Sequence, residues 1–496
     1  MSRLLSYAVI CVKNILRRGR LGSNVNEDVM KYTTSLEFDK EIFESDIYCD
    51  IAHTIMLTQQ DIISKEHGTI IVEELKNILS KGMQNLDLDP SLDDIHMVIE
   101  NELIKKIGED IAGRMHTGRS RNDEVATDLR LALRKKILEI VAMILKLNKS
   151  LLKVAESNKH TLSVGYTHLQ QAQPVTFGHQ MLSHVSAIER DISRFLDTYN
   201  RVNVCPLGSG AMATTGFNID RIKTKDLLGF DDIINNSMDG VSSRDFIAET
   251  MFDISMLGTN LSKICEELIV FSSCEFGTIE IANEYTSTSS IMPQKKNPDV
   301  AEISRAKLST LNGELVTVLT ILKALPNTYN RDLQEISPHL WKVTETILDT
   351  LHMVEGMVST LKVNAEKMEK LATENYSTAT ELADTLVREC DIAFRMAHGI
   401  VGELVRDSIE KNVPISSIIT ETLNKYGLNL SEESIKKALN PMENVKLRKV
   451  MGGPAPKELE RAVGHFNLKM DSYEKIVSEK YSNIENVEFK LINYKL

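Results

Sequence analysis

Residues 286–302 read T-S-T-S-S-I-M-P-Q-K-K-N-P-D-V-A-E, and this stretch decides how the rest of the chain is interpreted. It opens with five hydroxyl side chains in a row, which favour irregular backbone because they compete for nearby backbone hydrogen-bonding groups. Lys295 and Lys296 follow. A helix start is predicted next, with Asn297 as the N-cap and Pro298 as the first helical residue. The stretch therefore predicts a mobile, hydroxyl-rich loop beside two ammonium groups and a helix N-terminus, which together form an anion site with a candidate nucleophile or base.

Two interpretations of this stretch are possible: a solvated loop or the anion site described above. The solvated loop is the simpler one, since Ser/Thr runs and lysine pairs are usually exposed to water. The order of the residues, however, resembles the signature loop of the fumarase/aspartase superfamily, and in detail that of the argininosuccinate lyase family. Fumarases and aspartases carry a Gly-Lys-Val-Asn version, whereas 294–297 here is the Gln-Lys-Lys-Asn version of the argininosuccinate lyases. Thr288 stands where the family usually has Gly, which predicts a stiffer loop.

Length and composition indicate an ordinary soluble globular protein of 496 residues, long enough for two to four domains. The net charge of −12 argues against nucleic acid or an anionic membrane as a partner. The six cysteines form no C-x-x-C pair and no cluster with zinc spacing, so we expect reduced thiols in a cytoplasmic protein and no metal. No apolar run approaches the roughly 18 residues of a membrane span. Residues 1–14 are predicted to be a non-targeting extension.

Long helices are predicted where prolines are absent and apolar residues recur every three or four positions. These apolar patterns cover 137–154, 181–199, 261–271 and 308–322. The first lies in a helix expected from about Asp123 to Ser157. Four such helices in one region favour a bundle with shallow crossing angles. Some of the apolar faces are wider than one packing seam needs, so further burial between subunits is expected.

A second cluster, 113–123, reads G-R-M-H-T-G-R-S-R-N-D and precedes the first long helix. Its three arginines are either a solvated basic turn or forks for carboxylates, which arginine binds in bidentate fashion. The string closely resembles the family motif H-T-G-R-S-R-N-D, and the resemblance implies that Arg121 and Asn122 bind substrate. The family often continues with Gln, whereas this chain has Glu124, which adds a negative charge.

A third cluster, 165–174, reads G-Y-T-H-L-Q-Q-A-Q-P and precedes a predicted long helix. A lone histidine near a helix start is more often structural than catalytic. Here the residues match the family motif G-Y-T-H-L-Q, which implies that Thr167 binds substrate. The resemblance also implies that His168 pairs with Glu302, one turn into the helix after the signature loop. Such a pair would fix the tautomer of the histidine and raise its basicity.

Shorter matches to the family imply further substrate-binding residues. They are Ser35 in T-S-L-E-F-D (which also contains Asp39), Arg244 in S-S-R-D-F, and Tyr329 and Gln334 in T-Y-N-R-D-L-Q-E. The segment P-L-G-S-G-A at 206–211 resembles the family as well. Well-known members have a substrate-binding Lys three residues after the Gln. This chain has Ser337 there, and Arg331 or Lys342 is the candidate replacement.

The resemblance spans roughly 15–470 and implies an all-α subunit with a central bundle of long helices. The implied domains are 1–117, 118–366 and 367–496. Such subunits would form a homotetramer with a shared helical core. The three clusters lie far apart in the sequence, and in the family they meet only across subunits, so each active site would use residues from three chains.

The reaction implied by the resemblance is the reversible cleavage of argininosuccinate to arginine and fumarate, the last step of arginine synthesis, with no cofactor or metal. Proton removal next to a carboxylate gives a carbanion that is delocalised into that carboxylate and needs several fixed cationic and amide donors. Lys295 and Asn297 are candidate donors. Ser289 is the candidate base, activated by a nearby ammonium. His168 with Glu302 is one candidate for the general acid.

Two alternative functions stay open from the sequence. One is another lyase of the superfamily, such as adenylosuccinate lyase. The absence of that enzyme's M-P-Y-K-R-N version of the loop argues against it. The other is a non-catalytic structural protein, because the family also includes lens delta-crystallins that keep the fold without the activity. The presence of all four candidate catalytic residues argues against this second alternative.

Overall fold

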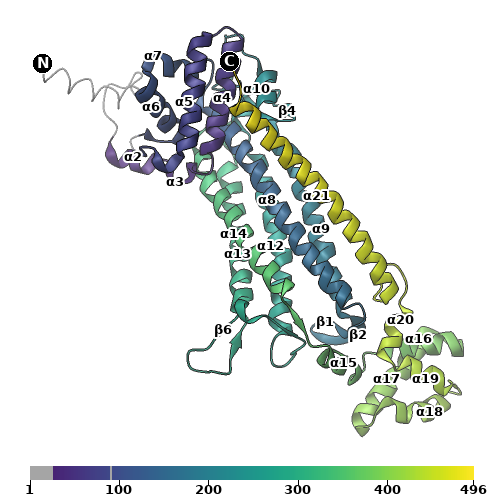
Figure 1. Cartoon of the computed structure of the whole chain (residues 1–496). Coiled ribbons are helices and arrows are strands. Elements are labelled where there is room, and N and C mark those ends of the chain that lie inside the picture. The colour runs from purple at the N-terminus through teal and green to yellow at the C-terminus, as the bar shows by residue number, and fades with distance from the viewer. Residues whose placement is uncertain (1–25, 90–91) are drawn as a thin grey trace.

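The computed structural model describes residues 26–89 and 92–496, so the predicted extension 1–14 lies outside the described residues. It shows an elongated, mainly helical molecule in which long helices run side by side and shorter ones gather at the two ends (Figure 1). The long helices are α8 (Arg121–Ser157), α9 (Phe177–Val202), α12 (Asp245–Phe271), α13 (Asp299–Leu322), α14 (Ser337–Ser359) and α21 (Pro456–Ile492). The all-α prediction is confirmed, and the four apolar patterns lie in α8, α9, α12 and α13.

Helix α8 sets the length of the molecule. Its start is fixed by a capping box, in which the Ser120 hydroxyl accepts a hydrogen bond from the Asn122 N–H at 3.3 Å and the Asp123 carboxylate accepts one from the Ser120 N–H at 3.1 Å. With 37 residues, the helix is about 55 Å long at a rise of roughly 1.5 Å per residue. Groups at its two ends are therefore too far apart to contact the same small substrate.

The core of the bundle forms where these helices pack in pairs. Helix α8 contacts α9, α14 and α21, while α12 contacts α9, α13 and α14. The predicted apolar patterns do not include α21. Its buried residues Met470, Val477, Ile484 and Leu491 recur every seven positions, as at a coiled-coil seam, and join the same core as α8. This narrow stripe packs α21 against the central bundle. Helix α21 nevertheless lies within 367–496, the segment predicted to be a separate C-terminal domain.

Short helices cover both ends of the bundle (Figure 1). The N-terminal ones are α2 (Glu27–Thr33), α3 (Leu36–Asp39), α4 (Phe43–Gln59), α5 (Lys65–Lys81), α6 (Ile95–Ile107) and α7 (Glu109–Ala112), with α10 (Arg221–Leu228) beside them. The opposite end carries α15 (Ala365–Thr373), α16 (Ala379–Cys390), α17 (Phe394–Lys411), α18 (Ile415–Lys425), α19 (Glu432–Ala438) and α20 (Pro441–Leu447). Helices α16 to α19 share an apolar core of their own. The domain boundaries at 117 and 366 remain proposals.

The strands are short and occur in pairs. β1 (Leu162–Thr167) and β2 (Gln170–Thr176) form an antiparallel hairpin between α8 and α9, and β6 (Ser287–Thr288) pairs with β7 (Lys296–Asn297) before α13. The other pairs are β3 (Val204–Cys205) with β4 (Asp232–Ile233) and β5 (Ile279–Glu280) with β8 (Lys362–Val363). Short helical turns are η1 (Met83–Asn85), η3 (Gly113–His116), η4 (Asn283–Tyr285), η5 (Arg331–Ile336) and α11 (Ser237–Ser242). Across 26–89 and 92–496, no helix has an apolar run that would cross a bilayer.

The three motif stretches lie in different parts of the subunit (Figure 1). The start of α8 lies at the end that α2 to α7 cover. The β1–β2 hairpin lies at the far end of α8, and the loop between β6 and β7 projects from the side of the bundle near that far end. The motifs predicted to form a single kind of site therefore lie apart within one subunit.

Candidate active site

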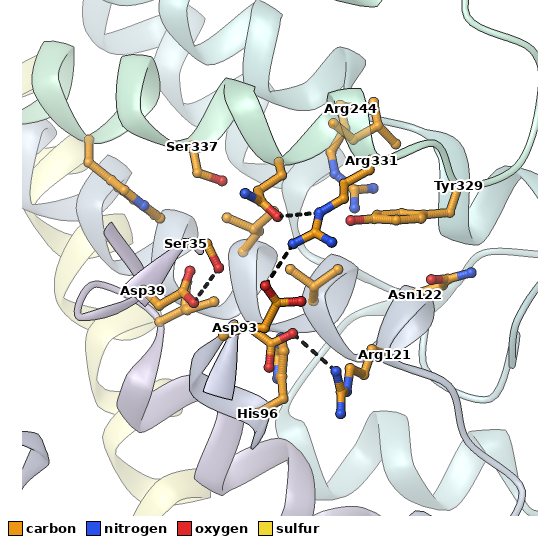
Figure 2. A pocket seen from close by; sticks show the side chains of 17 residues that line it. Ser35, Asp39, Asp93, His96, Arg121, Asn122, Arg244, Tyr329, Arg331 and Ser337 are labelled. Atoms are coloured by element: carbon orange, nitrogen blue, oxygen red, sulfur yellow. Dashed lines mark hydrogen bonds and ion pairs between the residues drawn. The ribbon is translucent and has the colours of Figure 1, made fainter. Parts of the chain in front are cut away.

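A cavity of about 210 Å³ opens at the start of α8, between α3, α6, α14 and η5 (Figure 2). Six of the eight predicted substrate-binding residues line it: Ser35, Arg121, Asn122, Arg244, Tyr329 and Gln334. They come from stretches that lie far apart in the sequence, so the fold has brought them together. The remaining lining includes Asp39, Asp93, Asp94, His96 and Arg331.

The local fold explains why Arg121 and Asn122 face this cavity. Both are first-turn residues of α8, placed by the capping box of Ser120. Asp123 then anchors a second segment, because its Oδ2 accepts hydrogen bonds from the N–H groups of Gly208 at 2.9 Å and Gly210 at 2.7 Å. Gly210 has φ of 62°, and a Cβ there would lie 2.6 Å from a backbone oxygen, so glycine is required at this position. The segment 206–211 thus supports the cavity from behind.

Arg244 brings an unpaired positive charge to the cavity wall. Only 2% of the residue is exposed, and its guanidinium donates to the carbonyl oxygens of Ser243 at 2.8 Å and Val241 at 3.4 Å. No described carboxylate pairs with it, and its Nε lacks a partner among the described residues. Burial lowers the pKa of Arg244 to about 10, with a small opposing effect of Tyr329. A buried guanidinium without a counter-ion beside a cavity is suited to receive a carboxylate from a ligand.

The structure distinguishes between the two candidate replacements for the missing lysine. Arg331 lines the cavity together with Ser337, donating to Asp93 Oδ1 at 3.0 Å and to the carbonyl oxygen of Thr33 at 2.7 Å. Lys342 is not part of the lining and instead pairs with Glu314 at 2.5 Å. The second arginine of the cavity wall is therefore Arg331.

Carboxylates form the opposite wall of the cavity. Asp39 Oδ2 accepts a hydrogen bond from the Ser35 hydroxyl at 2.7 Å and from the Ile95 N–H at 3.1 Å, and Asp94 pairs with Arg121 at 3.3 Å (Figure 2). Burial raises the pKa of Asp39 to about 6 against the opposing effect of His96. The cavity thus has an acidic wall and a basic wall, which suits a ligand that carries both cationic nitrogen and carboxylates.

The three arginines of 113–123 have three different roles. Arg121 lines the cavity, and Arg114 pairs with Asp110 at 3.0 Å on the surface. Arg119 is buried behind the cavity and bonds to Glu124 at 2.8 Å and to Asp50. Of the three arginines of this cluster, only Arg121 lines the cavity, so Arg114 and Arg119 are not placed to bind a substrate carboxylate there.

The added charge of Glu124 lies inside this buried group. Asp46, His96 and Glu124 each place one ligand atom within 4.8 Å of the others, and they form the only His/Cys/Asp/Glu group of metal-binding spacing in 26–89 and 92–496. One atom of each residue is already paired: His96 Nδ1 bonds to Asp46 Oδ1 at 2.9 Å and Glu124 Oε1 bonds to Arg119, whereas Asp46 Oδ2 and Glu124 Oε2 have no partner among the described residues. The contacts of this group within the subunit are those of an ion-pair network.

Thr167 and His168 lie at the tip of the β1–β2 hairpin and not at the wall of the cavity. Thr167 is opposite Gln170, which leaves His168 and Leu169 as a two-residue turn with φ of 56° and 57°. Such a turn needs left-handed backbone at both central positions. All four residues are exposed. The hairpin therefore holds the His168 ring away from its own subunit, nine residues before α9 begins at Phe177.

The pairing of β6 with β7 corrects one prediction about the signature loop. Asn297 lies opposite Ser287 in this pairing and has extended backbone, so it is not the N-cap of the next helix. Helix α13 begins at Asp299 with Pro298 at the N-cap and no side-chain capping bond. Thr288 lies opposite Lys296 in the same ladder, where any residue fits, so this position does not need the freedom of glycine.

Ser289 begins the loop that the two strands close. Its Oγ accepts hydrogen bonds from the N–H groups of Met292 at 3.0 Å and Ile291 at 3.3 Å. Lys295 is exposed and pairs with no carboxylate of the described residues, whereas Lys296 pairs with Glu280 at 2.8 Å. The lysines thus differ: Lys296 ties the loop to β5, and Lys295 is left available to a ligand.

Comparison with known proteins fits this arrangement. The Lyase family matches residues 19–313, and the argininosuccinate lyase C-terminal family matches 376–446. The argininosuccinate lyase of Methanococcus maripaludis is 74% identical over 97% of this chain and 100% of its own length, and that of Methanocaldococcus jannaschii is 68% identical over the same shares. The chain belongs to the argininosuccinate lyase family. Among solved structures, EDDS lyase in complex with formate has a TM-score of 0.84 at 31% identity and covers 95% of each chain.

Within this argininosuccinate lyase fold, the predicted residues divide into two groups. The six named above share the cavity, whereas the lining contains none of Thr167, His168, Ser289, Lys295, Asn297 and Glu302. In one subunit, His168 and Glu302 share no hydrogen bond or ion pair among the described residues. Their pairing stays a prediction.

Three residues of the cavity wall were not predicted from the sequence: the carboxylates Asp93 and Asp94, and the neighbouring His96. A local signal for them exists. Asp94 precedes an apolar run and accepts a hydrogen bond from the Met97 N–H at 2.9 Å, which is the mark of an N-cap. A capped helix start rich in charged side chains is a candidate ligand wall, and D-D-I-H at 93–96 has this form.

Proposed function

We propose that this chain catalyses the reversible β-elimination of argininosuccinate to L-arginine and fumarate, the last step of arginine biosynthesis, in the cytoplasm and without a metal or cofactor. One observation carries the proposal: six substrate-binding residues predicted from separate motifs line one cavity with an acidic and a basic wall. The relatives at 68–74% identity carry the name argininosuccinate lyase, which favours this reaction over the adenylosuccinate lyase and crystallin alternatives. Release of fumarate from argininosuccinate by the purified protein, followed by its ultraviolet absorbance, tests it directly.

The proposed chemistry begins with Ser289. As the base, its Oγ takes the proton from the carbon next to a succinate carboxylate, and the electron pair moves into that carboxylate. A serine alkoxide needs stabilisation, and the N–H groups of Ile291 and Met292 that point at the Oγ support this role. Lys295 would stabilise both the alkoxide and the dianion. The carbon–nitrogen bond then breaks, its electrons go to the guanidino nitrogen, and His168 with Glu302 is the proposed source of the proton that completes arginine.

The proposed substrate-binding residues hold the rest of the molecule. Arg121 and Arg244 would receive carboxylates, with Asn122, Asn297, Thr167, Tyr329 and Gln334 as further hydrogen-bonding partners. Ser35 lies beside Asp39 on the acidic wall, which suits the cationic nitrogen of the arginine half. Closure of the signature loop would exclude water from the reacting carbon.

We also propose that the active form is a homotetramer. Helix α13 exposes large apolar side chains, with Ile303, Val316 and Leu319 at 56%, 61% and 50% exposure, and Phe252 of α12 is 48% exposed. Surface of this kind is usually covered in an assembly. The length of α8 supports the same proposal, because residues at opposite ends of one subunit can serve one substrate only when they come from different chains.

A subunit-mixing experiment tests the shared site. Ser289→Ala and His168→Asn proteins are each expected to be nearly inactive. Hybrid tetramers made by unfolding and refolding a mixture should regain measurable fumarate release, because some sites then combine a wild-type Ser289 with a wild-type His168. Refolding each variant alone is the control. Hybrid tetramers confirmed by mass spectrometry that stay inactive would refute sites shared between chains.

A further inference from the structure

His96 joins the cavity to the buried ion-pair network behind it. It is the second residue of α6, is 8% exposed, and contributes to the cavity lining below Asp93 (Figure 2). On the other side, its Nδ1 lies 2.9 Å from Asp46 Oδ1. The distance requires a hydrogen on Nδ1, since Asp46 only accepts hydrogen bonds when ionised. The ring therefore lies between a set of buried carboxylates and the space that a substrate would fill.

The network behind the ring holds more carboxyl groups than cations. Its carboxylates are Asp46, Asp50, Glu124 and Asp128, and Arg119 is the cation among them. Glu124 Oε1 and Asp128 Oδ2 lie 3.9 Å and 3.8 Å from His96 Nδ1. Asp128 is fully buried, and neither of its oxygens has a hydrogen-bond partner among the described residues. Burial raises the pKa of Glu124 and Asp128, against the opposing effects of Arg119 on Glu124 and of His96 on both. A positive charge at His96 therefore favours the ionised forms of these buried carboxyl groups.

Other groups also act on the His96 ring. Those that face it are Asp39 from α3, Asp46 from α4, Asp94 from its own helix, Glu124 and Asp128 from α8, His116 from η3, and Tyr329 before η5. Burial, together with the positive end of α6, disfavours the charged ring. Burial lowers the pKa of His96, but Asp46 and Glu124 outweigh it and raise the pKa well above its usual value. The ring is thus charged at neutral pH.

We propose that His96 is a substrate-binding cation: its Nδ1–H is held by Asp46, and its other N–H receives a substrate carboxylate in the cavity. Asp46, Glu124 and Asp128 are then positioning residues, since they keep the charge on the ring without touching substrate. This proposal deepens the proposed function and rests on it. It adds His96 to Arg121, Arg244 and Arg331 as a fourth positive group at the cavity, and it gives the buried charge of Glu124 a role.

Substrate affinity in a protein that cannot turn substrate over tests the proposal. In a Ser289→Ala background, adding His96→Gln should weaken the binding of argininosuccinate about 10- to 100-fold by calorimetry, the effect of losing one charge-assisted hydrogen bond. An unchanged Kd in a folded protein of unchanged oligomeric state would overturn it. Fumarate release by the wild-type protein is measured alongside, because its absence would refute the proposed function separately from the role of His96.

Glu124→Gln supplies a second test that does not alter the cavity lining. The amide keeps the shape and can still accept from Arg119, but one negative charge near His96 is lost. The pKa of His96 should therefore fall, so 1/KM should decline with rising pH at a lower pH than in the wild type, while His96→Gln should abolish this decline. A pH profile of Glu124→Gln that matches the wild type would contradict the proposal. So would one equivalent of copurifying divalent metal that His96→Gln removes, because the ring would then bind an ion and carry no proton.

Discussion

Replacing Ser289 with alanine is expected to lower turnover by about 10²- to 10⁴-fold, the usual cost of removing a general base, while argininosuccinate still binds. Its hydroxyl acts on the proton only in the transition state, whereas the cavity at the start of α8 holds the substrate in the ground state. The N–H groups of Ile291 and Met292 that point at Oγ have no substitute acceptor in the variant. The measurements are kcat from fumarate release and Kd from calorimetry.

Ser290 provides the matched control. It is the next residue in the same loop, is exposed, and its hydroxyl makes no hydrogen bond to the described residues. Ser290→Ala should therefore keep substantial turnover. Near-normal activity in Ser289→Ala with loss of activity in Ser290→Ala would mean that the other hydroxyl is the base. If both variants stay active, the loop does not supply the base.

The bundle could be predicted from the sequence because four of its long helices have a regular apolar pattern that is visible in the local sequence. The pattern from Ile137 to Val154 is an unbroken stripe at helical spacing, and the helix expected from about Asp123 to Ser157 is α8, which begins two residues earlier at Arg121. The cavity residues were predictable for another reason. Short strings such as S-S-R-D-F match a family whose fold brings them together, and the structure places Arg244 and Tyr329 in the same cavity wall.

Features that depend on tertiary contacts escaped prediction. Helix α21 buries one residue in seven along much of its length, so its sequence looks like an exposed, charged tail until α8 lies beside it. Asn297 has the chemistry of an N-cap, but pairing with Ser287 holds it in a strand. The sequence does not distinguish the environments of Arg119 and Arg121. In the structure, Arg119 is buried against Asp50, whereas Arg121 pairs with Asp94 and faces the cavity.

Replacing Arg119 with methionine is expected to destabilise the protein by about 3–5 kcal/mol, the range for breaking a buried ion pair by removing one partner. Its side chain is 1% exposed and lies between Asp50 and Glu124. Without it, Asp50 would be buried with no cation of the described residues in contact, and Glu124 would have only His96 at 3.9 Å. Urea unfolding of the variant and the wild type at the same protein concentration measures the difference.

Two further variants separate charge from packing in this prediction. Arg114→Met removes an arginine of the same motif whose partner Asp110 is mostly exposed, and it should leave the unfolding free energy nearly unchanged. Adding Glu124→Gln to Arg119→Met should recover part of the lost stability, because one of the unpaired charges disappears. If the double variant is no more stable than Arg119→Met, the loss comes from packing around the long side chain. The network would then not depend on its charge balance, and the protonated state of His96 would lose its structural basis as well.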